Sequence, residues 1–299
     1  MPELPEVETA RRLTDTHLRG RTVAHVDLRL PKVLRDSPLP DPNVLVGATV
    51  EGARRRAKVM AIDFSNGVSL MVHFKLAGQW AILLPDGQRF VAGHPVPKPG
   101  GEYPHKSTHA DIIFEDGTIV YYSDIRQFGW WRLMPTADVE ASFEAFGFGP
   151  EGVGTPLDPK PLIATMARRG IPIKTLLLDQ SFIAGLGNIY VDEVLFRARV
   201  HPATPANAVS REKAKTIIAE IPWVLEQGIA QGGVKIVHSI AYPIDGFPAI
   251  HGREGEPCVR CGSTIVKTKV GARGTYYCPR CQKLPRKRTT AMKEPATMS

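Results

Sequence analysis

Four cysteines near the end of this 299-residue chain could together bind a metal ion. They form two C-x2-C pairs, Cys258 with Cys261 and Cys278 with Cys281, and sixteen residues separate the pairs. Thiolates at this spacing are typical ligands of a tetrahedral zinc site. Two disulfides or four unrelated thiols are the alternatives, and disulfides are rare in cytosolic proteins. The spacing therefore predicts one structural Zn²⁺.

The opening residues, Met1-Pro2-Glu3, could supply a nucleophile. A helix that starts at Pro5 accounts for the residues that follow, because proline suits a first helical turn, but Pro2 and Glu3 precede that helix. An initiator methionine is normally trimmed before a small residue, so we expect the mature chain to begin with the secondary amine of Pro2. The pKa of an N-terminal amine is about 8, so a useful fraction is neutral and nucleophilic at physiological pH.

The charge of the chain favours a polyanionic partner. The formal net charge is +8, and the stretch from Cys258 to Arg288 holds nine Lys or Arg residues and no Asp or Glu. A basic folded module commonly binds nucleic acid. The sequence has no run of about 18 apolar residues and no basic-then-apolar leader, so we expect neither a membrane span nor a signal peptide, and a cytosolic protein.

The apolar pattern changes from a β-strand period to a helical period along the chain. Short β-branched and aromatic segments predict strands at 22–28, 59–64, 68–74 and 118–123, and Ser65-Asn66-Gly67 predicts a hairpin turn. Residues 2–134 are therefore expected to form one leading helix on a β-sandwich or barrel.

Gly and Pro mark residues 135–160 as a linker that includes a helix at 137–145. Four later segments have a helical period: 161–169, 173–180, 188–198 and 210–231. We expect the last helix to break at Pro222 and to end at Gly232-Gly233. The predicted domains are a helical domain at 161–251 and a zinc ribbon at 252–283, followed by a disordered basic tail at 284–299.

Taken together, these features resemble the formamidopyrimidine-DNA glycosylase family, which also contains endonuclease VIII. The resemblance covers residues 2–283 and rests on "PELPEVE" at the start, "RRAK" at 55–58, "DIRQFG" at 124–129, "GLGNIYVDEVLF" at 185–196 and "GREGEPC" before the ribbon. It implies an α+β fold, with an N-terminal β-sandwich domain behind a leading helix and a C-terminal helix-two-turn-helix domain with a four-cysteine zinc ribbon. It also implies a monomeric, cytoplasmic and nucleoid-associated DNA glycosylase/AP lyase of base excision repair, acting on damaged double-stranded DNA.

The resemblance implies roles for four catalytic residues. Pro2 matches the nucleophile that attacks C1′ of a damaged nucleotide, and its Schiff base is an iminium whose fixed charge favours β,δ-elimination. Glu3 matches the acid–base group that protonates the opening sugar ring. Lys58 matches a lysine near the lesion, and Arg273 an arginine that grips phosphate and assists δ-elimination. Without the motifs, Lys58 reads as an ordinary exposed strand lysine and Arg273 as non-specific charge.

Phosphate contacts are implied for Asn188, Lys174, Arg168, Arg169 and His73. Gly185 and Gly187 are expected to allow close backbone approach beside Asn188. Glu6 and Glu193 are expected to hold the Pro2 amine in place, although either could be a surface carboxylate.

An enzyme that works on a base must extrude it from the duplex and fill the gap that it leaves. The family uses an apolar residue, an arginine and a phenylalanine, which fall here on Leu76, Arg126 and Phe128. Leu76 replaces a common methionine, and Gln127 stands where a second arginine is common.

The largest departure from the family lies at 234–250. This stretch is shorter than the loop that closes over 8-oxoguanine, lacks the usual Gly-Lys-Pro-Gly-Tyr run, and ends at His251 where tyrosine is usual. We expect removal of oxidised purines, formamidopyrimidine and 8-oxoguanine, with 8-oxoguanine less dominant. The alternatives are an endonuclease VIII-like glycosylase for oxidised pyrimidines and a non-catalytic damaged-DNA-binding zinc protein. Pro2, Glu3 and Lys58 together argue against the non-catalytic protein.

Overall fold

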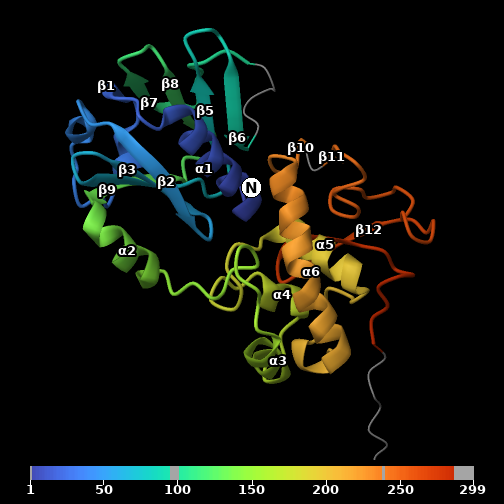
Figure 1. Ribbon diagram of the computed structural model, residues 1–299. Coiled ribbons are helices and arrows are strands. Elements are labelled where there is room, and N and C mark those ends of the chain that lie inside the picture. The colour runs from blue at the N-terminus through green and yellow to red at the C-terminus, as the bar shows by residue number, and fades with distance from the viewer. Residues whose placement is uncertain (1, 95–100, 238–239, 286–299) are drawn as a thin grey trace, which may run out of the picture.

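The computed structural model describes residues 2–94, 101–237 and 240–285, which form two lobes joined by the segment after α2 (Figure 1). The N-terminal lobe is a β-sandwich of two antiparallel sheets. One sheet has the order β1 (Val23–Leu28), β7 (Thr108–Phe114), β8 (Ile119–Asp124), β5 (Gly78–Leu83) and β6 (Arg89–Gly93). The other has the order β2 (Val50–Arg56), β3 (Val59–Phe64), β4 (Val68–His73) and β9 (Trp130–Pro135).

The expected sandwich is confirmed, and its core lies between the two sheets. Phe74, Trp80, Tyr122 and Trp131 are buried there with the aliphatic side chains of both sheets. The Asn-Gly turn joins β3 to β4, and Gly67 adopts a φ of 76° that glycine tolerates without strain. The sequence pattern missed β5, β6 and β7 of the sheet that starts with β1, and β2 and β9 of the other sheet.

The leading helix α1 (Leu4–Leu18) belongs to both lobes. Val7, Ala10 and Leu18 are buried in the core of the sandwich, whereas Leu4 is buried in the core of the C-terminal lobe. The first turn of α1 therefore lies where the two lobes meet.

The C-terminal lobe is helical, with the zinc ribbon packed against it. After α2 (Val139–Ala145) it contains α3 (Pro159–Ala167), α4 (Ile173–Leu177), α5 (Asn188–Ala198) and α6 (Arg211–Ala230). The expected break at Pro222 is wrong, since α6 is continuous through it. Ile218, Ile221 and Leu225 bury one face of α6 in the core, and this packing offsets the missing proline N–H.

The last described segments are short strands. The region after α6 carries β10 (Ile236–Val237) and β11 (Ile240–Ala241), and the ribbon hairpin is β12 (Val266–Val270) with β13 (Arg273–Tyr277). Residues 286–299, most of the expected basic tail, lie outside the described residues.

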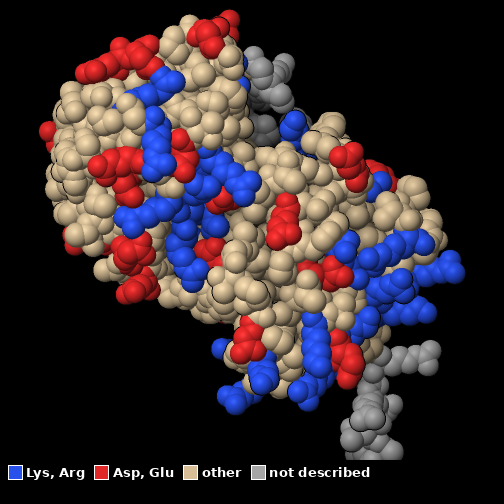
Figure 2. Space-filling model, in the orientation of Figure 1, with Lys and Arg blue, Asp and Glu red and all other residues tan. Residues whose placement is uncertain are grey.

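Lys and Arg side chains gather in two places on the face shown in Figure 2. One group lies over β2 and is interleaved with acidic groups, as in the pairs of Arg54 with Asp63 and Glu140. The other lies over the C-terminal lobe, with fewer acidic neighbours. Among the described residues, no helix combines the length and apolar character needed to cross a membrane.

Candidate active site

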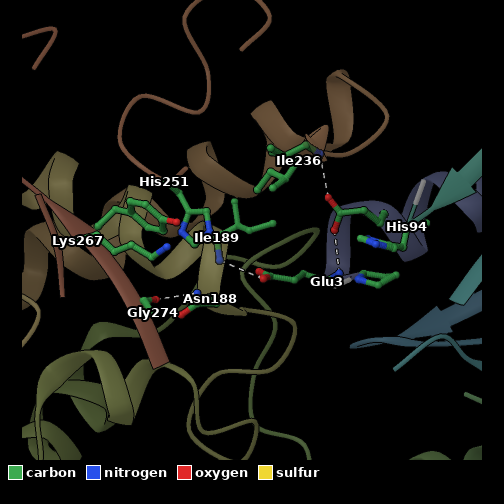
Figure 3. Close-up of a pocket in the computed structure, with 13 residues that line it drawn as sticks. Glu3, His94, Asn188, Ile189, Ile236, His251, Lys267 and Gly274 are labelled. Atoms are coloured by element: carbon green, nitrogen blue, oxygen red, sulfur yellow. Dashed lines mark hydrogen bonds between the residues drawn. The ribbon is translucent and has the colours of Figure 1, made fainter. Parts of the chain in front are cut away.

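A pocket of about 520 Å³ opens between the lobes, and both contribute to its walls (Figure 3). It is lined by Pro2, Glu3 and Glu6 at the start of α1, His94 after β6, Asn188 and Ile189 at the start of α5, His251, and Lys267, Gly274 and Tyr276 of the ribbon. The sequence-predicted nucleophile and its acid–base partner therefore lie in one cavity.

Glu3 is fully buried beside Pro2 and is fixed by the C-terminal lobe. Its Oε1 accepts a hydrogen bond of 3.0 Å from the backbone N–H of Ile189, in the first turn of α5 (Figure 3). The positive end of the helix dipole favours a carboxylate at this position. Its Oε2 is also buried, and it has no hydrogen-bond partner among the described residues. One oxygen thus positions the carboxyl group, and the other is left without a hydrogen bond.

Gly185 and Gly187 make room for the first residues of α1. A Cβ at position 187 would lie 2.2 Å from Cδ of Glu3, and one at position 185 would lie 2.3 Å from Cδ1 of Leu4. The close approach expected at these glycines therefore occurs, but its partner in this structure is the start of the same chain.

Glu6 accepts hydrogen bonds from the backbone at the start of α1 and from the backbone after α6. Its Oε2 accepts the N–H of Glu3 at 2.8 Å, and its Oε1 accepts the hydroxyl of Tyr190 at 2.7 Å and the N–H of Val234 at 2.9 Å. Burial raises the pKa of the Glu6 carboxyl above its ordinary value, and the nearby Glu3 carboxylate raises it further. Glu6 thus orders the residue after Pro2.

Glu193 lies elsewhere. Its carboxylate accepts the N–H groups of Ala249, Ile250 and His251, so it orders the loop that ends in His251. Its expected role in holding the Pro2 amine finds no support in these contacts.

Lys58 occupies the tip of the β2–β3 hairpin and reaches across to the C-terminal lobe. Its Nζ donates to the carbonyl of Leu186 at 2.7 Å. Burial lowers the pKa of Lys58 below its ordinary value, while the carboxylates of Glu3 and Glu6 oppose that shift. Lys58 is therefore close to Glu3 and Glu6 at the start of α1, as its motif implies.

The tip of that hairpin is held in place by an ion-pair network. Glu151 accepts the N–H of Ala57 and pairs with Arg55 at 3.0 Å and Arg56 at 3.1 Å. Arg55 also pairs with Glu8 of α1 at 3.1 Å. The sequence reading of 135–160 as a linker missed this contact, because nothing in the spacing of Glu151 marks it.

Lys174 is fully buried. Its Nζ donates to Asp192 at 2.7 Å and to the carbonyl of Gly274 at 3.1 Å. Burial lowers the pKa of the Lys174 ammonium, and the Asp192 carboxylate opposes that shift. The phosphate contact expected of Lys174 is not supported by this geometry, since the ammonium joins α4 to α5 and the ribbon.

Asn188 lines the pocket from α5, and Arg273 lies in the ribbon next to the lining residue Gly274. The side-chain amide of Asn188 donates to the carbonyl of Gly274 at 2.9 Å, and its Oδ1 has no partner in the described part of the chain. Arg273 begins β13, directly before Gly274, and its side chain is exposed. Both residues remain candidates for phosphate contacts.

The three residues expected to fill the duplex gap lie on two neighbouring loops of the sandwich. Leu76 follows β4 and is half-buried, whereas Phe128 is 44% exposed in the loop after β8. The guanidinium of Arg126 lies 5.1 Å from the centre of the Phe128 ring. An exposed aromatic ring with a cation near it suits stacking on a base.

The other expected phosphate ligands lie apart from one another. Arg168 and Arg169 are exposed just after α3. His73 ends β4, and its Nδ1 accepts the N–H of Lys75 at 3.0 Å. Burial and the neighbouring cations of Lys75 and Lys58 lower the pKa of His73 to about 3, so the ring is neutral at physiological pH.

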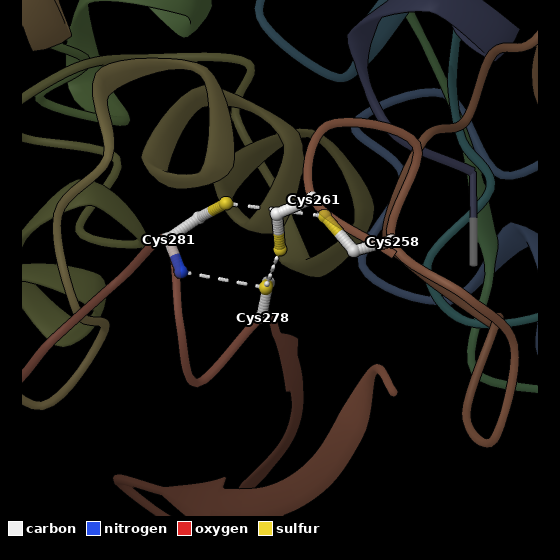
Figure 4. Close-up of side chains that lie close together, drawn as sticks. All are labelled: Cys258, Cys261, Cys278 and Cys281. Carbon is white, nitrogen blue, oxygen red and sulfur yellow. Dashed lines mark hydrogen bonds between the residues drawn. The ribbon is translucent and has the colours of Figure 1, made fainter. Parts of the chain in front are cut away.

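The four cysteines converge in the ribbon (Figure 4). Their Sγ atoms all lie within 4.8 Å of one another, with 3.5 Å between Cys261 and Cys278 and 4.0 Å between Cys258 and Cys281. A tetrahedral Zn²⁺ with Zn–S bonds of about 2.3 Å places its sulfurs about 3.8 Å apart. The cluster fits one structural zinc ion, which would fix the hairpin that carries Arg273 and Gly274.

Comparisons with known proteins give consistent results. Models of the formamidopyrimidine-DNA glycosylase N-terminal domain, of its H2TH domain and of the zinc finger found in FPG and IleRS match residues 1–131, 148–239 and 255–284. A formamidopyrimidine-DNA glycosylase of Streptococcus thermophilus is 37% identical over 95% of the chain and 100% of its own length. One of Bacillus cereus is 34% identical over 94% and 99%. The Lactococcus lactis Fpg with abasic-site DNA superposes with a TM-score of 0.82 at 31% identity, over 94% of this chain and 100% of that one.

Proposed function

The chain belongs to the formamidopyrimidine-DNA glycosylase family, and on that premise we propose that it removes oxidised purines through a Schiff base on Pro2 and then cuts the strand by β,δ-elimination. The observation that carries the proposal is that Pro2 and Glu3 line the same cavity, with a Glu3 carboxyl group whose buried Oε2 has no hydrogen-bond partner among the described residues. A buried carboxylate oxygen without a hydrogen-bond partner is uncommon in folded proteins.

The reaction begins at the Pro2 nitrogen, which attacks C1′ of the extruded nucleotide and displaces the base. Glu3 supplies a proton to the opening sugar ring, and the N–H of Ile189 keeps its carboxyl group in place. The resulting iminium acts as an electron sink, so the C2′ proton becomes acidic and the 3′ phosphate leaves by β-elimination. Removal of Met1 is a requirement, since only a free Pro2 amine can react.

Cations around the cavity complete the proposal. Lys58 lies beside Glu3 and Glu6, and its lowered pKa fits a group that exchanges protons near the lesion. Arg273 and Asn188 grip flanking phosphates, and Arg273 assists δ-elimination. Leu76, Arg126 and Phe128 fill the space left by the base. The protein acts as a monomer on damaged double-stranded DNA, in the cytoplasm at the nucleoid.

Borohydride trapping on abasic-site duplex tests the nucleophile. We expect a covalent adduct whose DNA-bearing peptide begins at Pro2, and no adduct from a variant with an extra residue before Pro2. An adduct that maps to Lys58 would overturn the assignment. Glu3→Gln should still be trapped on abasic DNA while losing base excision.

Nicking assays on four duplexes test the choice of base. Formamidopyrimidine, 8-oxoguanine, thymine glycol and an abasic site should be compared by single-turnover rate. We expect formamidopyrimidine and the abasic site to react well, with 8-oxoguanine less dominant because the 234–250 segment is short. Fastest excision of thymine glycol would instead identify an enzyme of the endonuclease VIII kind, and no reaction with any duplex a non-catalytic binder.

A further inference from the structure

His94 is a residue of the pocket that the sequence pattern did not single out. It follows β6 directly and lines the cavity together with Pro2, Glu3 and Glu6. In Figure 3, Glu3 lies between His94 and Asn188, so His94 lies on the side of the cavity where the chain starts. No hydrogen bond joins the His94 ring to another described residue. The ring is therefore available to a bound substrate.

The backbone at His94 is fixed by β5. The N–H of His94 donates to the carbonyl of Gly78 at 2.9 Å, and its carbonyl accepts from Nε2 of the buried Gln79 at 2.9 Å. Gly93 has a φ of 95°, and a Cβ there would lie 2.5 Å from the carbonyl oxygen of Gly78. Glycine alone tolerates both conditions. The main chain therefore places the imidazole on the wall of the pocket, and only its side-chain torsions are left to vary.

The strand that carries His94 packs against α1, the helix that follows Pro2. The rings of Phe90 in β6 and His17 in α1 are stacked, with 3.8 Å between their centres. His94 and Pro2 are therefore positioned by one packed unit of the N-terminal lobe.

The ring of His94 is neutral at physiological pH. Burial and the positive charge of the amino terminus of the chain lower its pKa to about 4, although the carboxylate of Asp124 opposes the shift. In a neutral imidazole one nitrogen carries a hydrogen and the other accepts. His94 thus offers the cavity a proton acceptor that is in its reactive form throughout the physiological range.

Formation of a Schiff base at Pro2 requires two proton movements in opposite directions. When the amine attacks C1′, its nitrogen keeps its hydrogen and becomes positively charged, and it must lose that proton before the iminium can form. The oxygen of the opening sugar ring must gain a proton, which Glu3 supplies. Oε1 of Glu3 already accepts the N–H of Ile189, which leaves Oε2 to carry that proton. Because a carboxyl group that holds its proton is a poor acceptor, the proton on the proline nitrogen needs a separate base.

We propose that His94 is a further catalytic residue, the general base that takes this proton from the Pro2 nitrogen. The proposal rests on the proposed function, because it takes Pro2 as the nucleophile. The N–H bond of the proline breaks, and the freed electron pair forms the N=C1′ double bond as the C1′–O4′ bond breaks and O4′ takes the proton of Glu3. The damaged base leaves with the electron pair of its bond to C1′ and takes a proton from water. His94 ends as an imidazolium, whose proton neutralises the hydroxide so formed.

The other carboxylate and imidazole of the cavity that could accept this proton are engaged elsewhere. The two oxygens of Glu6 accept from three donors. Nδ1 of His251 lies 2.7 Å from Oδ2 of Asp192. In Figure 3, Glu3 lies between His251 and His94. Among the described groups, the His94 ring is therefore the base best placed to receive the proton.

Single-turnover excision of formamidopyrimidine by His94→Ala tests the proposal. A general base contributes about 10²- to 10⁴-fold, so we expect excision to slow by at least about a hundredfold. Affinity for a duplex with a tetrahydrofuran abasic analogue, which has no base to displace, should equal that of the wild type. His25→Ala is the matched control, since His25 is exposed on β1 and the variant should excise at the wild-type rate. Normal excision by a folded His94→Ala protein, or a loss of affinity as large as the loss of excision, would overturn the proposal.

Added imidazole distinguishes a chemical role of His94 from a structural one. Imidazole can enter the space that His94→Ala leaves, so it should restore excision in proportion to its concentration, and more basic substituted imidazoles should restore it further. His94→Gln fills that space and cannot take up the proton, so it should be as slow as His94→Ala and gain nothing from imidazole. Wild-type excision by His94→Gln, or no rescue of His94→Ala, would show that His94 is not the general base.

Borohydride trapping on abasic-site duplex distinguishes this proposal from the proposed function. An aldehydic abasic site has no base to displace, and its carbonyl oxygen takes up the amine proton by way of water, so both His94 variants should still be trapped at Pro2. Wild-type trapping at Pro2 with normal excision by both variants refutes only the role of His94, whereas no trapping of the wild-type protein refutes the proposed function.

Discussion

Replacing Gly187 by alanine tests whether the placement of the Glu3 carboxyl group limits catalysis. The φ of Gly187 is −135°, which alanine adopts freely, so the substitution acts through space and not through backbone strain. The new Cβ would lie 2.2 Å from Cδ of Glu3 and 2.5 Å from each of its carboxylate oxygens. Ordinary contacts between such atoms are about 3.5 Å, so the carboxyl group must move by about 1 Å.

That movement breaks the 3.0 Å hydrogen bond from Ile189. Overpacking of this kind costs about 1–3 kcal/mol of the free energy of unfolding. A misplacement of about 1 Å at a catalytic group slows the reaction by roughly a hundredfold. We therefore expect Gly187→Ala to remain folded at 25 °C and to excise base about a hundredfold more slowly in single-turnover assays.

The control is Gly170→Ala, where a Cβ would meet no heavy atom closer than the 4.0 Å to Asn207. Excision by this variant should equal that of the wild type. A double variant adds a sharper test, because Gly187→Ala and Glu3→Gln act on the same group. Their combined loss should be close to the larger single loss. The reasoning would be refuted if the two fold-losses in excision rate multiplied in the double variant. Normal excision by a folded Gly187→Ala protein would refute it as well.

Three further predictions concern the metal, the ion-pair network of the hairpin and pH. Removing zinc by chelation, or by Cys258→Ser, should weaken DNA binding at least tenfold in anisotropy assays while near-ultraviolet circular dichroism still reports a folded sandwich; intact binding by metal-free protein would contradict this. Glu151→Gln should lower the free energy of unfolding by about 1–3 kcal/mol in urea titrations, because buried Arg55 loses a charged partner. For His73, the folded pKa of about 3 lies below the unfolded value of about 6.5. As the pH is lowered below about 6.5, the unfolded chain binds a proton that the folded chain does not, so the free energy of unfolding decreases. His73→Gln should reduce that fall by up to about 1.4 kcal/mol per pH unit between pH 6 and pH 5, and an unchanged slope would show that this ring is not responsible.

The sequence predicted those features whose chemistry is local. Two C-x2-C pairs identify a zinc site without knowledge of the fold, and the structure brings the four sulfurs together as that spacing implies. Glycine after asparagine fixed the β3–β4 turn. The strand β6 was missed because it lies at a sheet edge with only Ala92 buried, which gives a weak apolar signal.

Contacts between residues distant in sequence escaped prediction. Nothing in the sequence near Lys174 indicates that Asp192 will neutralise its ammonium inside the fold, and a lysine before an apolar run resembles a surface residue. The pairing of His251 with Asp192 joins residues 59 positions apart and depends on how the ribbon packs on α5. Such pairs follow from tertiary packing and not from any periodicity in the chain.

Helix α1 packs in the cores of both lobes, and this has a consequence for the synthesis of the protein. Leu4 is buried in the core of the C-terminal lobe, and Glu6 accepts the N–H of Val234, so the first residues made have no place to dock until residue 234 has been translated. At about 5–20 residues per second, that interval lasts at least roughly 10 seconds on the ribosome. During this time the amino terminus is accessible to the enzymes that process nascent chains. On the proposed function, Met1 is then removed while this end of the chain is accessible, and Pro2 is enclosed only when the C-terminal lobe has formed.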